Sequence, residues 1–179
     1  MSPQFNVRDE ELGEGLFAVL NTLFSKAALE EVCAECEFCY KDKQSFCTGM
    51  FEWVVYGLYV LESAVQEHSD RTGCLPFLQD AFFGALSKGS STKLESETFR
   101  KLAEASLKAY RKAGNTHNRT AALGVKRIFN LPPGTVPEGS ELGAMLRAEL
   151  EGRMEQTFSL LERLLRPVAS ASSVESKAS

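Results

Sequence analysis

The segment from Phe51 to Val65 is the feature that most constrains what this chain can fold into. Its apolar residues recur at intervals of three and four, and further apolar residues fill most of the remaining sides of the same helix. A helix that is apolar nearly all round has no side to turn to solvent, so other helices must enclose it. The segment therefore predicts an all-α bundle with a central helix from about Thr48 to His68.

The remaining sequence predicts a single compact bundle of about six helices, without strand-like alternation. Apolar stripes at helical spacing cover about residues 9–24, 29–40, 76–87, 92–113 and 120–130, and a long last helix follows over about 142–165. Thr92 followed by Glu95 fits a capping box at the start of the helix over 92–113. Two prolines and a glycine after Leu131 predict a hinge at 131–139. We expect one domain over residues 1–167 and a disordered Ser- and Ala-rich tail over 168–179.

Hydropathy and the N-terminal sequence bear on where the protein resides. The longest nearly unbroken apolar run, Val54 to Leu61, is far shorter than the ~20 residues that a membrane span needs. The first residues lack the basic start and apolar core of a secretory signal. We expect no membrane span and a cytoplasmic location, with the nucleus as the alternative.

Four of the five cysteines form the strongest candidate for a metal or cluster site, and they are Cys33, Cys36, Cys39 and Cys47. Four thiolates can hold zinc or an iron–sulfur cluster. On a helix, however, positions 33, 36 and 39 step round the axis by about 60° each time, so they converge on one metal only if the helix ends or distorts there. Because buried cysteines pack as small apolar residues, we expect reduced core thiols, no metal and no cofactor.

Catalytic and cofactor-binding motifs are absent from the sequence. Gly13-Glu-Gly15 lacks the third glycine and the preceding strand of a dinucleotide-binding loop, and no phosphate-binding Gly-Lys-Ser or Gly-Lys-Thr loop occurs. Neither histidine, His68 or His117, lies in a zinc-protease or nucleophile motif. The sequence therefore predicts a protein that is not an enzyme.

Charge is distributed unevenly along the chain, whose net charge is -4. Residues 1–70 hold 13 acidic and 4 basic side chains, a balance of -9, whereas residues 100–127 hold 8 basic side chains and 1 acidic, a balance of +7. The basic segment could contact the phosphates of a nucleic acid, or the two segments could neutralise each other in the fold. Its basic residues are Arg100, Lys101, Lys108, Arg111, Lys112, Arg119, Lys126 and Arg127.

A family resemblance lies in the central helix. The segment Val55-Tyr-Gly-Leu58-Tyr-Val-Leu61-Glu-Ser63 resembles a helix in the N-terminal helical domain of COMMD proteins. With its neighbours the resemblance covers about Leu12 to Lys112, and it implies a non-enzymatic adaptor of the kind that family supplies to endosomal trafficking and transcriptional regulation. The β-containing C-terminal domain through which the family dimerises has no counterpart here, because Leu142 to Leu165 predicts a helix. No binding residue is carried over.

These observations together predict a module that binds a protein partner or associates with itself through amphipathic helices. The long last helix is the expected partner surface, with Leu150, Phe158 and Leu161 as exposed anchors, if its apolar face exceeds what its own domain covers. The alternative for this helix is that it closes its own core. The alternative function is a nucleic-acid-associated, self-assembling protein that uses the basic segment 100–127.

Overall fold

The computed structural model describes residues 8–114 and 117–166, except for the side chains at positions 69, 117 and 118. No strand occurs in these ranges, so the predicted all-α class is confirmed; the tail at 168–179 lies outside them. In chain order the elements are α1 (Asp9–Leu23), α2 (Lys26–Glu35), α3 (Lys43–Gln66), the 3-10 turn η1 (Ser69–Cys74), α4 (Leu75–Lys88), α5 (Lys93–Lys112), α6 (His117–Gly124), the π-helical turn η2 (Val125–Phe129) and α7 (Glu141–Leu165).

Helix α3 occupies the centre of the bundle, as its apolar repeat predicts. It packs against α1, α5, α7 and η2, and Trp53, Tyr56 and Leu61 are fully buried. The indole nitrogen of Trp53 donates a hydrogen bond to the carbonyl of Ser25 at 3.1 Å, which ties α3 to the start of α2. Among the described helices, α3 included, none combines the length and apolarity that crossing a bilayer requires.

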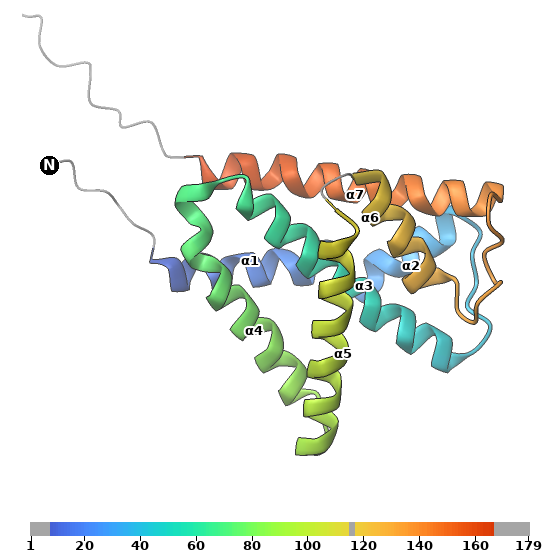
Figure 1. Ribbon diagram of the computed structural model, residues 1–179, viewed down its shortest axis with the longest axis horizontal. Coiled ribbons are helices and arrows are strands. Elements are labelled where there is room, and N and C mark those ends of the chain that lie inside the picture. Colours follow the sequence, from blue (N-terminus) through green and yellow to red (C-terminus); the bar gives the residue numbers. More distant parts are fainter. Residues whose placement is uncertain (1–7, 115–116, 167–179) are drawn as a thin grey trace, which may run out of the picture.

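Helix α7 runs along the length of the bundle and closes its core (Figure 1). It packs against α3 and α6. Across the bundle, the Arg153 guanidinium donates to the carbonyl of Leu23 at 3.3 Å and lies 3.2 Å from a carboxylate oxygen of Glu31. The predicted long last helix is confirmed, and Arg153 fastens it to the end of α1 and to α2.

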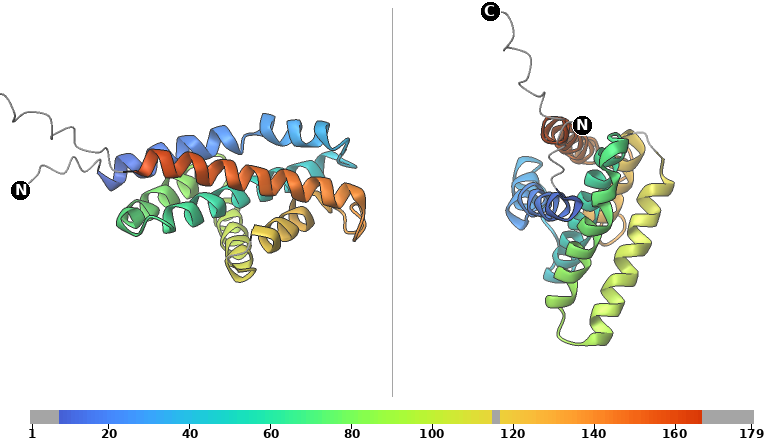
Figure 2. Two further views of the ribbon diagram at one scale, coloured as in Figure 1. Left: turned by 90° about the horizontal axis from the view of Figure 1, so that it is seen from above. Right: turned by 90° about the vertical axis from the view of Figure 1, so that its left-hand side faces the viewer.

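Helices α4 and α5 form a hairpin that projects away from the other helices (Figures 1 and 2). Helix α4 approaches α1 closely, since a Cβ at Gly13 would lie 2.9 Å from the backbone nitrogen of Leu78. The hairpin turn ends in the predicted capping box, in which the Thr92 hydroxyl accepts from the amide of Glu95 at 3.1 Å and the Glu95 carboxylate accepts from the amide of Ser91 at 2.6 Å.

Two helix boundaries differ from the sequence-based expectation. Helix α2 ends at Glu35 instead of near residue 40, because Glu37 adopts a left-handed φ of 52° and the Phe38 amide turns back to the Cys33 carbonyl at 2.8 Å. Helix α3 begins at Lys43 instead of about residue 48, because the Asp42 carboxylate caps it by accepting from the Ser45 amide at 2.7 Å.

The loop between η2 and α7 is held by its own hydrogen bonds. The Asn130 side-chain oxygen accepts from the amides of Gly134 and Val136 at 2.8 and 2.9 Å. Gly134 and Gly139 have φ values of 94° and 72°, which other residues rarely adopt. The loop therefore has a defined shape, and its predicted role as a hinge stays a prediction.

Candidate functional site

A groove opens between α1, α3 and the α4–α5 hairpin, and we call it the aromatic groove. Its volume is about 260 Å³. Four phenylalanines from four different helices contribute to it, and most of its apolar side chains are half-buried. The residues that line it are Phe17, Asn21, Phe51, Val54, Phe82, Ala85, Leu86, Gly89 and Phe99.

Aromatic contacts hold the walls of the groove together. The rings of Phe51 on α3 and Phe99 on α5 lie 5.9 Å apart between their centroids. On α4 the rings of Phe82 and Phe83 are 5.3 Å apart in an edge-to-face arrangement, and the Arg100 guanidinium lies 4.7 Å from the centre of the Phe83 ring. Such contacts restrict the rotamers of the lining residues, so the groove keeps its shape without a ligand.

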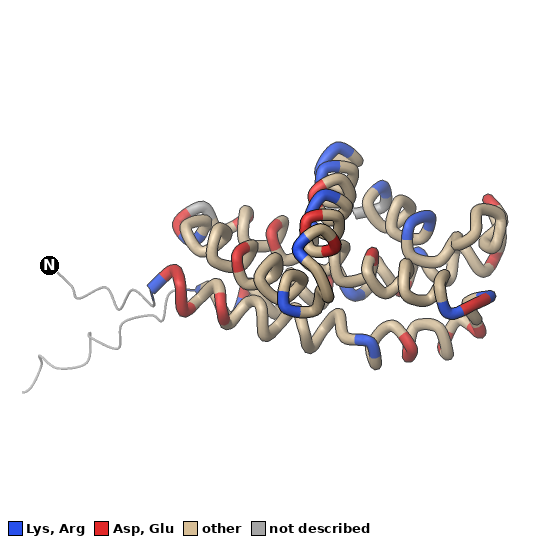
Figure 3. Tube along the Cα trace, turned by 90° about the horizontal axis from the view of Figure 1, so that it is seen from below, with Lys and Arg blue, Asp and Glu red and all other residues tan. Residues whose placement is uncertain are grey.

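Carboxylates extend from the α1 side of the groove. Glu10, Glu14, Phe17 and Asn21 follow one another at four, three and four positions, which places them on one stripe of the helix. Both glutamates are exposed, and within the described residues neither forms a salt bridge. Figure 3 shows acidic positions gathered at the start of α1. The groove therefore joins an apolar floor to an acidic edge.

Two ion pairs with buried carboxylates join the acidic and basic segments. The Arg127 guanidinium binds both carboxylate oxygens of Glu52 at 3.1 Å and donates to the Ser106 hydroxyl at 2.7 Å. The Arg111 guanidinium binds the Glu62 carboxylate at 2.8 Å. Glu52 and Glu62 are 8% and 2% exposed, so both carboxylates are removed from water. Part of the charge asymmetry is thus neutralised inside the fold.

The eight predicted nucleic-acid-binding residues do not form one free patch. Besides Arg111 and Arg127, Arg100 is paired with Glu104 at 3.2 Å. Lys101, Lys108 and Lys112 share the exposed side of α5, and Arg119 and Lys126 are exposed farther along the chain. Figure 3 shows the basic positions along α5 and on α6. Of the eight residues, these five have no salt bridge within the described part of the chain, and three of them lie on α5.

The predicted partner anchors on α7 are not an exposed surface. Leu150 and Leu161 are fully buried, and Phe158 is half-buried against the core. The expectation of exposure is wrong for both leucines, because α7 turns its apolar stripe towards α3 and α6 and covers it within the domain. The exposed large apolar residues of α7 are instead Met145 and Leu164, at 41% and 55%.

The candidate metal ligands differ in burial. Cys36 is buried and Cys33 half-buried at the end of α2, whereas Cys39 and Cys47 are exposed. No set of three or more His, Cys, Asp or Glu residues within the described ranges is arranged to hold a metal ion.

Thiol reactivity provides a test of this arrangement. Burial, with smaller contributions from Cys36 and Cys39, raises the pKa of Cys33 from about 9 to about 11. Because the thiolate is the nucleophile, we expect Cys33 to react with iodoacetamide at pH 8 roughly 100-fold more slowly than an ordinary thiol, and tenfold faster per pH unit up to about pH 11. Peptide mass spectrometry would measure this, with exposed Cys39 alkylated first. Equal rates in the folded protein would contradict the burial of Cys33.

Comparisons with protein-family models, curated proteins and solved structures find no match to this chain. The resemblance of the central helix to COMMD proteins therefore stays a prediction. The aromatic groove was not predicted, because its phenylalanines are separated by up to 82 residues and each belongs to the margin of a different helical stripe. The only hint of the groove in the sequence is that these four residues are all phenylalanines.

Proposed function

We propose that this chain is a non-enzymatic protein-interaction module that binds an amphipathic, basic helix of a partner protein in the aromatic groove. The observation that carries the proposal is a preformed apolar groove, open to solvent and lined by Phe17, Phe51 and Phe99. Helices bind such grooves by inserting a few apolar side chains spaced at three and four positions. The module's role would be that of an adaptor, in agreement with the expectation from the family resemblance.

The size of the groove favours side-chain anchors over a small-molecule ligand. Sites for small molecules usually enclose about 300–1,000 Å³, and they bury most of their ligand. The groove holds about 260 Å³ and is open along one side. That space suits one or two large apolar side chains of a longer segment that continues across the surface.

The charge of the groove's edge favours a basic partner. Glu10 and Glu14 are aligned with Phe17 on α1 and have no salt bridge within the described residues. A helix with its apolar face in the groove would bring its flanking lysines or arginines to this edge. Such rim charges mainly steer association and choose between partners.

The proposal is tested with a defined probe, a fluorescent amphipathic peptide built from leucine and lysine at helical spacing. We expect saturable binding by fluorescence anisotropy, and binding at least tenfold weaker, or about 1.4 kcal/mol, when Ala85→Arg places a cationic side chain over the groove. Ala85 is exposed and lies in the lining, so the substitution leaves the core intact. Glu14→Lys should weaken binding by a smaller factor.

The matched control is Ala105→Arg, an exposed alanine on the outer side of α5 and outside the groove. It should bind the peptide as the parent protein does. A peptide with glutamate in place of lysine should bind more weakly to the parent. Equal loss in both arginine variants, or no preference between the two peptides, would contradict the proposal.

A nucleic-acid role is the alternative, and the lysines on the exposed side of α5 favour it. Lys101, Lys108 and Lys112 can reach one phosphate backbone, since they lie on one stripe of a helix. Binding of a fluorescent oligonucleotide would then fall steeply with salt, because phosphate contacts release counterions. Binding of the amphipathic peptide, which depends on apolar contact, would change far less.

A further inference from the structure

The exposed side of α5 carries an apolar stripe, and we call this stripe, with the lysines that border it, the α5 outer face. Its large apolar side chains are Leu94 and Leu102, which are 73% and 51% exposed. Each leucine lies four positions from Thr98, so the three side chains follow one stripe of the helix, and exposed Ala105 continues it. Binding to another molecule would remove these leucines from water.

The charge of the α5 outer face is mainly positive. Its exposed lysines are Lys101, Lys108 and Lys112. None of the three forms a salt bridge within the described residues. Beside them, Glu97 supplies one negative charge, and the carboxylate of Glu104 is already paired with Arg100 at 3.2 Å. The α5 outer face is therefore an amphipathic, basic helix surface.

The spacing of these groups matches the α1 side of the aromatic groove. Phe17 follows Glu14 by three positions and Glu10 by seven, and Lys108 follows Leu102 by six. A helix rises about 1.5 Å per residue, so six positions span about 9 Å. If an antiparallel helix sets Leu102 against Phe17, Lys108 falls between the levels of the two carboxylates.

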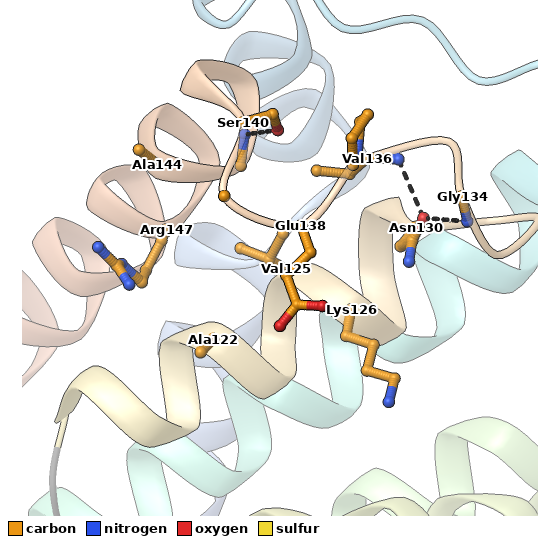
Figure 4. A pocket seen from close by; sticks show the side chains of 13 residues that line it. Ala122, Val125, Lys126, Asn130, Gly134, Val136, Glu138, Ser140, Ala144 and Arg147 are labelled. Carbon is orange, nitrogen blue, oxygen red and sulfur yellow. Dashed lines mark hydrogen bonds between the residues drawn. The ribbon is translucent and has the colours of Figure 1, made fainter.

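A larger hollow, between η2 and the start of α7, suits this surface less well (Figure 4). Its volume is about 720 Å³, and none of the described residues that line it is aromatic. In Figure 4 the Glu138 carboxylate lies between Lys126 and Arg147. These two cations would repel the lysines of the α5 outer face, whereas the acidic edge of the aromatic groove attracts them.

We propose that the aromatic groove binds the α5 outer face of a second copy of this chain, with Leu102 as the apolar anchor and Lys108 beside Glu10 and Glu14. The inference rests on the proposed function, because it names the basic helix that the groove binds. The α4–α5 hairpin projects from the other helices, which leaves its outer face open to another copy (Figures 1 and 2). Since the two surfaces differ, the contact is heterologous and adds copies in a row or a ring.

The test measures the mass of the full chain by sedimentation velocity over a range of concentrations. We expect the mass of the parent protein to rise with concentration. Leu102→Glu blocks the α5 outer face and Ala85→Arg blocks the groove, so each should weaken self-association at least tenfold. An equimolar mixture of the two variants should form a heterodimer and nothing larger, because it contains one intact groove and one intact outer face for each pair of chains.

Two controls make the assignment specific. Leu164→Glu on α7 changes a leucine of similar exposure, 55%, and should self-associate as the parent does. Lys108→Glu and Glu14→Lys should each weaken self-association about fivefold, and the double variant should restore it, because the exchanged charges attract again. These exposed substitutions serve alone if Ala85→Arg fails to fold.

The amphipathic peptide of the previous test separates the two proposals. Leu102→Glu keeps its groove and should bind the peptide at least as tightly as the parent. If the parent binds the peptide but stays monomeric, only this inference fails; if the peptide does not bind either, the proposed function fails with it. The inference is also overturned if self-association survives Leu102→Glu or Ala85→Arg, or if nuclease abolishes it, which would place a nucleic acid on the lysines.

Discussion

Replacing Leu161 with glutamate is expected to unfold the protein or to remove at least about 4 kcal/mol of its stability. The side chain is fully buried in the core between α7 and the rest of the bundle. The substitution removes apolar burial worth about 2–5 kcal/mol and places a carboxylate inside the apolar core. Since domains are commonly stable by about 5–15 kcal/mol, the loss is close to the whole of that stability. Urea unfolding followed by circular dichroism would measure it.

The matched control for this prediction is Leu164→Glu, on the same helix. Leu164 is 55% exposed, so the same chemical change should alter stability by no more than about 0.5 kcal/mol. Comparing the two variants distinguishes the two roles considered for α7, which are a core helix and a partner surface. Comparable stability of both variants would mean that the stripe with Leu161 is a partner surface, as the sequence suggested.

Replacing Arg127 with leucine is expected to cost about 3–5 kcal/mol, because it leaves the buried Glu52 carboxylate without its cation. The pair is bidentate and is completed by the Ser106 hydroxyl, and within the described residues no second cation forms a salt bridge with Glu52. The change should appear as a lower urea midpoint with an unchanged m-value, the slope of the unfolding free energy against urea concentration. An unchanged m-value indicates that unfolding exposes the same surface area in both proteins.

Two further variants isolate the cause of that loss. Lys126→Leu removes the adjacent, exposed cation and should change stability by no more than about 0.5 kcal/mol. The double variant Glu52→Leu/Arg127→Leu should regain much of the lost stability, since it removes the unpaired carboxylate as well. If the double variant is as unstable as Arg127→Leu, packing and not charge burial explains the effect.

The sequence was sufficient for features that depend on local periodicity. The dense apolar repeat of α3 placed it at the centre, and Thr92 with Glu95 marked the start of α5. The end of α2 was missed, because a left-handed residue such as Glu37 has no composition signal when it is not glycine. The start of α3 was missed although Asp42 is a common capping residue, since the polar run around it suggested a loop.

The candidate sites depended on contacts that periodicity does not encode. Leu150 is a core residue because the apolar stripe of α7 faces the bundle. The same stripe facing outward would have made it a surface residue, and the sequence pattern is identical in the two cases. A usable signal for the ion pairs did exist: Glu52 and Glu62 interrupt an otherwise apolar helix, and a carboxylate in such a place requires a buried partner. Which arginines supply it follows only from the packing of α5 and η2 against α3.

The ion pairs of Glu62 with Arg111 and of Glu52 with Arg127 also join parts of the chain that are synthesised at different times. The partner of Glu62, Arg111, lies 49 residues later in the sequence, and the partner of Glu52, Arg127, lies 75 residues later. While the first half alone has left the ribosome, its central helix carries two carboxylates without their cations, within a segment that repels itself. The native core, in which both carboxylates are buried beside these arginines, is therefore complete only after the C-terminal half has emerged.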